Sequence, residues 1–286
     1  MRLATIKIHG NETAAVVTSA CAIPIEAINH EFSQQWPTEL FDLLPLEQLN
    51  PFKEWIAGQD PASINKLAIP EANYGPLYRH PRKIWGIGLN YVEHAADLSE
   101  VSPNTEPASF MKPDTTIIGP GDVIEVPLQS ERTTAESELG IIIGKECKNV
   151  EEKEALSVIA GYTTIIDMTA EDILQRNPRY LTRAKSFDTF FSFGPQLVTA
   201  DEVEDVLGLK VATVINGEIH RDNLVSNMKF QPQHLISFHS KVMTLLPGDI
   251  ISTGTPGAVV IRDGDVVECR IEGFETLVNP VKDLKT

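Results

Sequence analysis

Thr134-Ala-Glu-Ser-Glu-Leu-Gly-Ile-Ile-Ile-Gly144 is the stretch that decides the fold of this 286-residue chain. The run is largely apolar and predicts a β-strand. Side chains at positions i and i+2 of a strand point to the same face. Glu136 and Glu138 therefore project together from an otherwise apolar segment.

A third acid, Asp167, closes a second apolar run, Ile159-Ala-Gly-Tyr-Thr-Thr-Ile-Ile-Asp167. If it lies beside Glu136 and Glu138, the repulsion among three like charges must be relieved by a proton or a cation. Three carboxylates with no cysteine and no nearby histidine suit a hard ion, Mg²⁺ or Mn²⁺, with water completing the shell. The alternative is that the two glutamates form a solvated strand face, which is common for surface residues.

The overall charge of the chain limits its partners. A hydrophobic content of 42% and a charged content of 22% are ordinary for a soluble globular protein. The formal net charge of −16 argues against nucleic acid and against anionic membrane surfaces, because phosphate would repel such a chain. An anionic small-molecule substrate would need a metal ion or local basic residues to overcome this background.

The cysteines and the N-terminal residues indicate the compartment. Cys21, Cys147 and Cys269 are odd in number, widely spaced and without metal-ligand spacing, which favours a reducing environment. Residues 1–9 lack the apolar core of a signal peptide, and no apolar run approaches ~18 residues. We predict a cytoplasmic protein that does not span a membrane.

The residue composition of the sequence changes after its first quarter. Two short β-like runs, 2–8 and 13–19, open the chain, and residues 69–82 are rich in Pro, Tyr, Asn and Gly. We therefore predict a small N-terminal α/β module, residues 1–78, and a larger catalytic domain, residues 79–286.

The larger domain shows dense β-branched runs with turn signals between them. Gly121-Asp122, Gly248-Asp249 and Gly264-Asp265 each predict a turn directly before a strand. Expected helices are fewer, at 92–98, 151–158, 170–176 and 232–244. The sum predicts a β-rich α+β fold without the regular alternation of strands and helices in a doubly wound sheet.

His94 and Asp97 form a candidate general base. On a helix, residues at i and i+3 share one face and can form a hydrogen bond. A carboxylate fixes the tautomer of a histidine and raises its basicity, as a general base requires. The alternative is an incidental pair on a surface helix.

Three further residues are candidates for contacting a substrate. Lys185 beside a metal ion could neutralise a developing oxyanion, and Arg183 could clamp a carboxylate. The hydroxyl of Thr255, in a glycine-rich turn, could donate to a carboxylate. The alternatives are two solvated basic side chains and a plain turn. Thr169-Ala-Glu-Asp172 matches a capping box, which predicts a helix start just after Asp167.

Taken together and in this order, these motifs resemble the fumarylacetoacetate hydrolase family over residues 80–282. The stretches that carry the resemblance are Ile84-Trp-Gly-Ile-Gly-Leu-Asn-Tyr-Val-Glu-His94, Phe110-Met-Lys-Pro, Ile118-Gly-Pro-Gly-Asp122, Glu136-Ser-Glu-Leu-Gly-Ile-Ile-Ile-Gly144, Ala160-Gly-Tyr-Thr through Asp167, Lys185-Ser-Phe-Asp-Thr, Asn216-Gly-Glu and Gly248-Asp-Ile-Ile-Ser-Thr-Gly-Thr-Pro256.

The resemblance implies a mixed β-sandwich roll, usually a homodimer, with Mg²⁺ or Mn²⁺ bound by the three acids. It implies that His94 and Asp97 form a dyad that activates water. It also matches Lys185 to the family lysine near the substrate and Thr255 to the threonine that contacts the substrate.

The sequence departs from the family pattern at three positions around the substrate. The dyad acid is commonly Glu, whereas this chain has Asp97. Glu171 stands in place of an arginine that helps bind the substrate carboxylate, and Arg183 is our candidate substitute. Leu174 holds the position of a common Gln, with Gln175 next to it. A shift of one residue on a helix turns a side chain by about 100°.

The resemblance leads to three functional hypotheses. The first is a divalent-metal-dependent hydrolase that cleaves a C–C bond in acylpyruvate-like 2,4-diketo acids. The second keeps the metal without attack by water, as an oxaloacetate decarboxylase or as a keto–enol isomerase or decarboxylase of hydroxymuconate-type acids. The third is a non-catalytic protein that binds keto acids.

Overall fold

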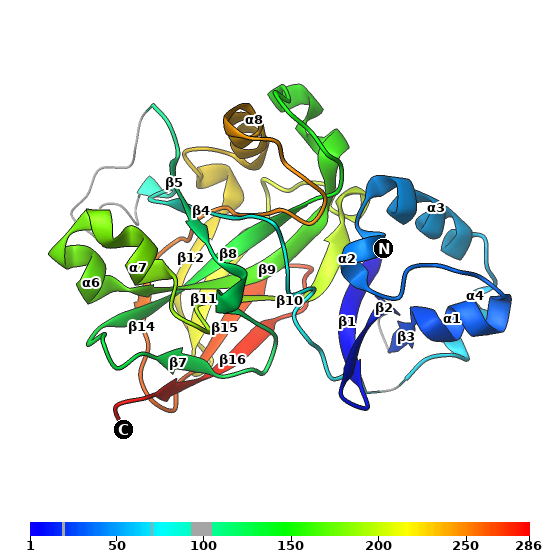
Figure 1. Cartoon of the computed structure of the whole chain (residues 1–286), viewed down its shortest axis with the longest axis horizontal. Helices are drawn as coiled ribbons and strands as arrows, with labels where there is room; N and C mark the ends of the chain where they lie inside the picture. The colour runs from blue at the N-terminus through cyan, green and yellow to red at the C-terminus, as the bar shows by residue number, and fades with distance from the viewer. Residues whose placement is uncertain (19–20, 70, 93–104) are drawn as a thin grey trace.

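The computed structural model describes residues 1–18, 21–69, 71–92 and 105–286. Within these residues the strands form two mixed sheets, one of eleven strands and one of five (Figure 1). This arrangement confirms the predicted β-rich α+β fold. In the described residues, no helix is long and apolar enough to cross a membrane.

The larger sheet has the strand order β3-β2-β1-β10-β9-β8-β13-β4-β5, with β14 paired to β8 and β6 paired to β10. Its strands are β1 (Arg2–Ile8), β2 (Asn11–Val17), β3 (Ala22–Pro24), β4 (Ile84–Gly88), β5 (Ala108–Lys112), β6 (Ile117–Ile118), β8 (Thr133–Ile143), β9 (Ile159–Ala170), β10 (Phe191–Thr199), β13 (Ile250–Ser252) and β14 (Val259–Val260).

The smaller sheet has the strand order β12-β11-β15-β16-β7. Its strands are β7 (Ile124–Val126), β11 (Lys210–Ile215), β12 (Glu218–Leu224), β15 (Val266–Ile271) and β16 (Leu277–Asp283). The described helices are α1 (Ile25–Phe32), α2 (Leu40–Leu43), α3 (Leu46–Ala57), α4 (Pro61–Asn65), α6 (Glu171–Arg176), α7 (Leu181–Lys185) and α8 (Pro232–Val242). Short 3₁₀ turns are η1 (Asp114–Thr116), η2 (Glu152–Val158), η3 (Pro178–Tyr180), η4 (Ala200–Glu202) and η5 (Val225–Asn227).

Strand β8 is buried along its whole length because both of its faces are covered. From one face, Leu139 and Ile141 pack in the same core as Val211 and Val267 of the smaller sheet. From the other face, Ile142 packs in a core that includes residues of the N-terminal helices. Glu136 and Glu138 share that second face, and Lys185 of α7 contacts Glu136 there.

The N-terminal strands extend the large sheet. Strand β1 pairs antiparallel with β10, from Arg2 opposite Val198 to Ala4 opposite Gln196. Helices α1–α4 lie at this end of the molecule (Figure 1). The division into a module of residues 1–78 and a domain of residues 79–286 stays a prediction, and the β1–β10 pairing joins the two parts.

The three Gly-Asp turns share one geometry. In each, the glycine has a positive φ of about 80° and the aspartate side chain accepts a backbone N–H from the residue three positions earlier. A positive φ costs glycine little. The turns precede strands β7, β13 and β15, as the sequence predicts.

Two local predictions are wrong. Thr169 does not cap helix α6, whose N-cap is Ala170 without a side-chain cap bond. The reason is that β9 continues to Ala170, so Thr169 pairs with Thr134 on β8 and its hydroxyl donates elsewhere. Residues 152–158 form the 3₁₀ turn η2 rather than an α-helix. The predicted helix 92–98 lies outside the described residues beyond Val92.

Gly161 tests the tight pairing of β9 and β10. A Cβ atom there would lie 2.3 Å from the backbone oxygen of Val198, which cannot rotate away. We expect Gly161→Ala to lower the free energy of unfolding by about 1–3 kcal/mol, as overpacking does. Urea unfolding measures the change. Gly88→Ala is the matched control, because its Cβ would lie 3.6 Å from the backbone oxygen of Ala108. Equal effects of the two substitutions would refute this reading of the strand contact.

Candidate metal centre

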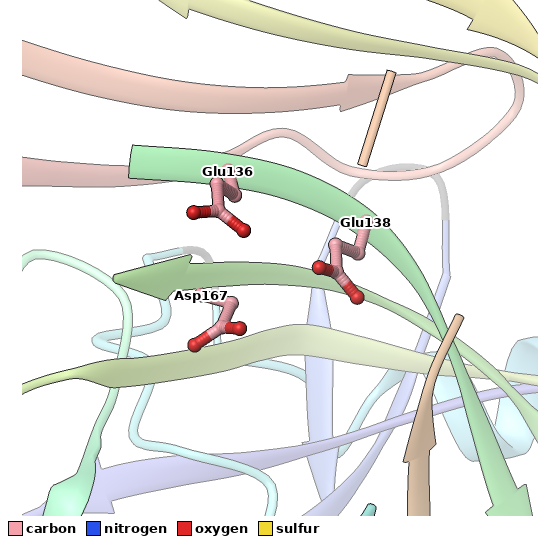
Figure 2. Close-up of side chains that lie close together, drawn as sticks. All are labelled: Glu136, Glu138 and Asp167. Carbon is pink, nitrogen blue, oxygen red and sulfur yellow. The ribbon is translucent and has the colours of Figure 1, made fainter. Parts of the chain in front are cut away.

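The structure brings the three predicted acids together. Glu136 lies directly opposite Asp167 in the β8–β9 ladder, and Glu138 follows on the same face of β8. Figure 2 shows the three carboxylates directed into one space from the two neighbouring strands. Glu136 is 8% exposed, Glu138 1% and Asp167 0%, so the alternative of a solvated strand face is wrong.

The geometry of the three acids fits a hard divalent ion. One oxygen from each carboxylate lies within 4.8 Å of the others. Ligand oxygens held about 2.1 Å from an octahedral ion are about 3.0 Å apart when adjacent and about 4.2 Å apart when opposite, a spacing of the same order as that of the trio. Glu136, Glu138 and Asp167 could therefore hold Mg²⁺ or Mn²⁺.

Two buried lysines compensate the negative charge. Lys185, on α7, contacts Glu136 Oε2 at 3.0 Å and Asp167 Oδ2 at 2.7 Å. Lys112, on β5, contacts Asp167 Oδ1 at 2.6 Å. Although burial opposes it, the charges of Asp167 and Glu136 raise the pKa of Lys185. Sequence reasoning predicted Lys185 near the metal and gave no role to Lys112.

Hydroxyl and backbone groups hold the two glutamates. Thr169 Oγ1 donates to Glu136 Oε1 at 2.5 Å. Ser252 Oγ and the backbone N–H of Gly254 donate to Glu138 Oε2 at 2.5 and 2.7 Å. Each donor stabilises the ionised form of its acceptor. The ligands are therefore held in place by neighbouring parts of the fold.

Gly254 connects the centre to the predicted dyad segment. Its φ is +98°, and a Cβ atom would lie 2.8 Å from the Cβ of Asn90. The buried Asn90 side chain donates to the backbone oxygens of Thr253 at 2.7 Å and Phe230 at 3.0 Å. Asn90, four positions before His94 in the sequence, therefore lies next to Gly254, whose backbone N–H donates to Glu138. His94 and Asp97 themselves lie outside the described residues.

The two predicted substrate contacts have different surroundings. Thr255 is buried, and its hydroxyl interacts with the backbone of Gly257 at 3.2 Å. Arg183 is exposed, and its side chain makes no hydrogen bond or ion pair with another described residue. On α7 it precedes Lys185 by two positions, a rotation of about 200°. Its side chain therefore leaves the helix on a different side from Lys185.

Glu171, which we expect to stand in place of a family arginine, is held by its neighbours. Arg132 Nε donates to Glu171 Oε2 at 2.5 Å, and Gln175 Nε2 donates to Glu171 Oε1 at 3.0 Å. Both carboxylate oxygens thus have a donor. Leu174 packs against the core. Sequence reasoning did not identify Arg132, which directly precedes β8.

Glu138 and Asp167 have pKa values shifted in opposite directions. Burial first, and then the charge of Asp167, raise the pKa of Glu138 to about 8. Asp167 differs, because Lys112 and Lys185 outweigh burial and hold its pKa below the usual range. Two acids of one centre therefore ionise at well-separated pH values.

A metal ion needs the ionised form of Glu138, so ion and proton compete below pH 8. We expect Mn²⁺ binding at pH 7 to release about one proton, and the affinity to fall about tenfold per pH unit below the pKa of Glu138. Calorimetry in two buffers of different ionisation enthalpy measures the proton. Glu138→Gln is the control, which should remove the release. Binding of Mn²⁺ without proton release in the unaltered protein would contradict the raised pKa.

Comparisons with known proteins identify the family of this chain. The profile of the family described as Fumarylacetoacetate (FAA) hydrolase C-terminal matches residues 83–282. Human "Oxaloacetate tautomerase FAHD2B, mitochondrial" is 37% identical over 210 residues, which cover 70% of this chain and 67% of the human protein.

Two solved structures share the whole fold. Maleylpyruvate hydrolase from Sphingobium sp. SYK-6, in complex with manganese(II) and pyruvate, is 28% identical with a TM-score of 0.81, covering 99% of each chain. The 5-carboxymethyl-2-hydroxymuconate delta-isomerase from Mycobacterium smegmatis is 29% identical with a TM-score of 0.76, covering 99% of this chain and 100% of that one. The profile match, the identity and the shared fold together show that this chain belongs to the fumarylacetoacetate hydrolase family.

Proposed function

We propose that this protein is a divalent-metal-dependent hydrolase that cleaves a C–C bond in acylpyruvate-like 2,4-diketo acids. The observation that carries the proposal is the buried trio of Glu136, Glu138 and Asp167 in direct contact with Lys185. The ion, Mg²⁺ or Mn²⁺, would supply Lewis acidity toward the keto-acid oxygens. The relative that binds manganese together with pyruvate supports this choice of ion and substrate class.

The residues of the chain divide the chemistry among them. Cleavage of a 2,4-diketo acid leaves a pyruvate enolate, whose negative charge needs a nearby cation. Lys185 is that cation, because its ammonium group lies within 3.0 Å of two of the ligand carboxylates. His94, oriented by Asp97, accepts the proton of the attacking water. Thr255 contacts the substrate, and Arg183, which leaves α7 on a different side from Lys185, binds a distal carboxylate of the substrate.

A second candidate omits the attack by water. Oxaloacetate decarboxylation, or keto–enol isomerisation or decarboxylation of hydroxymuconate-type acids, also passes through an enolate that Lys185 could stabilise. The shorter dyad acid Asp97 and the name of the human oxaloacetate tautomerase favour this candidate. A third candidate is a non-catalytic protein that binds keto acids, motivated by Glu171 and Leu174. In all three cases we propose a cytoplasmic homodimer.

The reaction is tested with a small panel of substrates. We expect turnover of acetylpyruvate with Mn²⁺ or Mg²⁺ and none with excess chelator, because the substrate is oriented through the ion. His94→Ala should lower hydrolysis by about 10²–10⁴-fold, the usual contribution of a general base. Coupled detection of pyruvate measures the rate.

The same preparation separates the candidates. Turnover of oxaloacetate that survives His94→Ala, with no acetylpyruvate cleavage, would replace the hydrolase by the second candidate. Tight oxalate binding without turnover of any diketo acid would leave the third candidate. Hydrolysis unchanged in His94→Ala would exclude the proposed general base.

Arg183 is tested through the binding of dicarboxylate substrates. Losing a charge-assisted hydrogen bond costs about 1.5–3 kcal/mol, so Arg183→Gln should raise KM at least about tenfold for a substrate with a distal carboxylate. The KM for acetylpyruvate should change little. The matched control is Arg176→Gln, since Arg176 pairs with Asp172 on the neighbouring helix α6. An unchanged KM in Arg183→Gln would rule out the proposed contact of Arg183 with the substrate carboxylate. Arg132 would then be the next arginine to test.

A further inference from the structure

Lys112 is the most deeply buried cation of the centre. Its side chain is 0% exposed, as is that of Asp167, and the two are joined by a 2.6 Å ion pair. The ammonium group also donates to the backbone oxygen of Lys185 and, at 3.5 Å, to that of Met168. A lysine has three N–H donors, so Lys112 has an acceptor for each of them. It is therefore fixed in place.

The two lysines divide the oxygens of Asp167 between them. Lys112 takes Oδ1, whereas Lys185 lies against Oδ2 and also reaches Glu136. The side of Asp167 that carries Oδ2 therefore faces Glu136, another of the residues that would hold the ion. Lys112 lies on the opposite side of that carboxylate, where it contacts neither of the other two ligands among the described interactions.

The charges of these groups determine what the centre attracts. When all three carboxylates are ionised, as they would be around a bound ion, they and the two ammonium groups sum to a charge of minus one. A divalent ion makes the loaded centre plus one, which favours an anion. Without Lys112 the loaded centre would be neutral, although the three ligands would all remain.

We propose that Lys112 is a positioning residue that acts through Asp167 and keeps the metal-loaded centre cationic, so that it binds dianionic keto acids and enolates. It contributes to anion affinity and not to metal affinity. A positive charge beside Asp167 repels the ion, so removing it does not weaken metal binding. The inference deepens the proposed function and rests on it for the ion and for the class of substrate.

The experiment measures two affinities separately. Calorimetry gives the Kd of Mn²⁺ for the protein and then the Kd of oxalate, a dianion that resembles the pyruvate enolate, for the Mn²⁺-loaded protein. In Lys112→Met we expect the Mn²⁺ affinity to be retained or increased and the oxalate affinity to fall at least about tenfold. The electron paramagnetic resonance spectrum of bound Mn²⁺ should respond to oxalate only at correspondingly higher concentrations.

Two further variants control for structural damage. Lys112→Gln keeps hydrogen-bond donors for Asp167 without the charge, and it should reproduce the loss of oxalate affinity; it also carries the test if Lys112→Met does not fold. Lys83→Met removes another Lys–Asp pair, half-buried Lys83 with buried Asp249 at 2.6 Å, which is not part of the acid trio. Both affinities should be unchanged in Lys83→Met.

Each other outcome overturns the inference. If Mn²⁺ and oxalate affinity fall together in both Lys112 variants, the residue has only a structural role. If oxalate affinity is unchanged, or is preserved in Lys112→Gln, the charge of Lys112 does not act on the anion. If the unaltered protein binds no Mn²⁺, the proposed metal-dependent function fails as well, and this result is distinct from the other two.

Discussion

The central constraint on this structure is the repulsion between two carboxylates that lie opposite each other in the middle of a buried sheet. Glu136 faces Asp167 across the β8–β9 ladder, and Glu138 adds a third acid on the same face. Like charges directly opposite each other destabilise a sheet, and burial increases the cost of each unpaired charge. Lys112 and Lys185 offset part of this cost. The remaining negative charge is what an ion would neutralise.

The order of strands in the large sheet explains why the centre involves so much of the chain. Adjacent strands β9, β8 and β13 carry Asp167, the two glutamates and Ser252 in turn, and the neighbouring β4 and β5 lead to Asn90 and Lys112. A shift of one residue in the β8–β9 or β13–β8 ladder would turn a ligand or its donor to the opposite face. The same pairing that builds the core therefore also fixes the centre.

The sequence predicted the parts that follow from local periodicity. The alternation on β8 placed Glu136 and Glu138 on one face, and the motif order placed Asp167 and Lys185 beside them. Lys112 was missed because a lysine ending a short strand has no local sign of burial; only the pairing of distant strands buries it. The capping motif at Thr169 misled for the same reason, since a tertiary contact with Glu136 took its hydroxyl.

The negative charge of Glu171 near the metal centre is compensated by neighbouring residues. Taken alone, a glutamate in place of an arginine would repel an anionic substrate. However, Arg132 and Gln175 donate to its two oxygens, so its charge is compensated within the protein. Repulsion by a carboxylate weakens when its oxygens are already paired. The attraction of the centre for an anion is therefore determined by the ion and the two buried lysines.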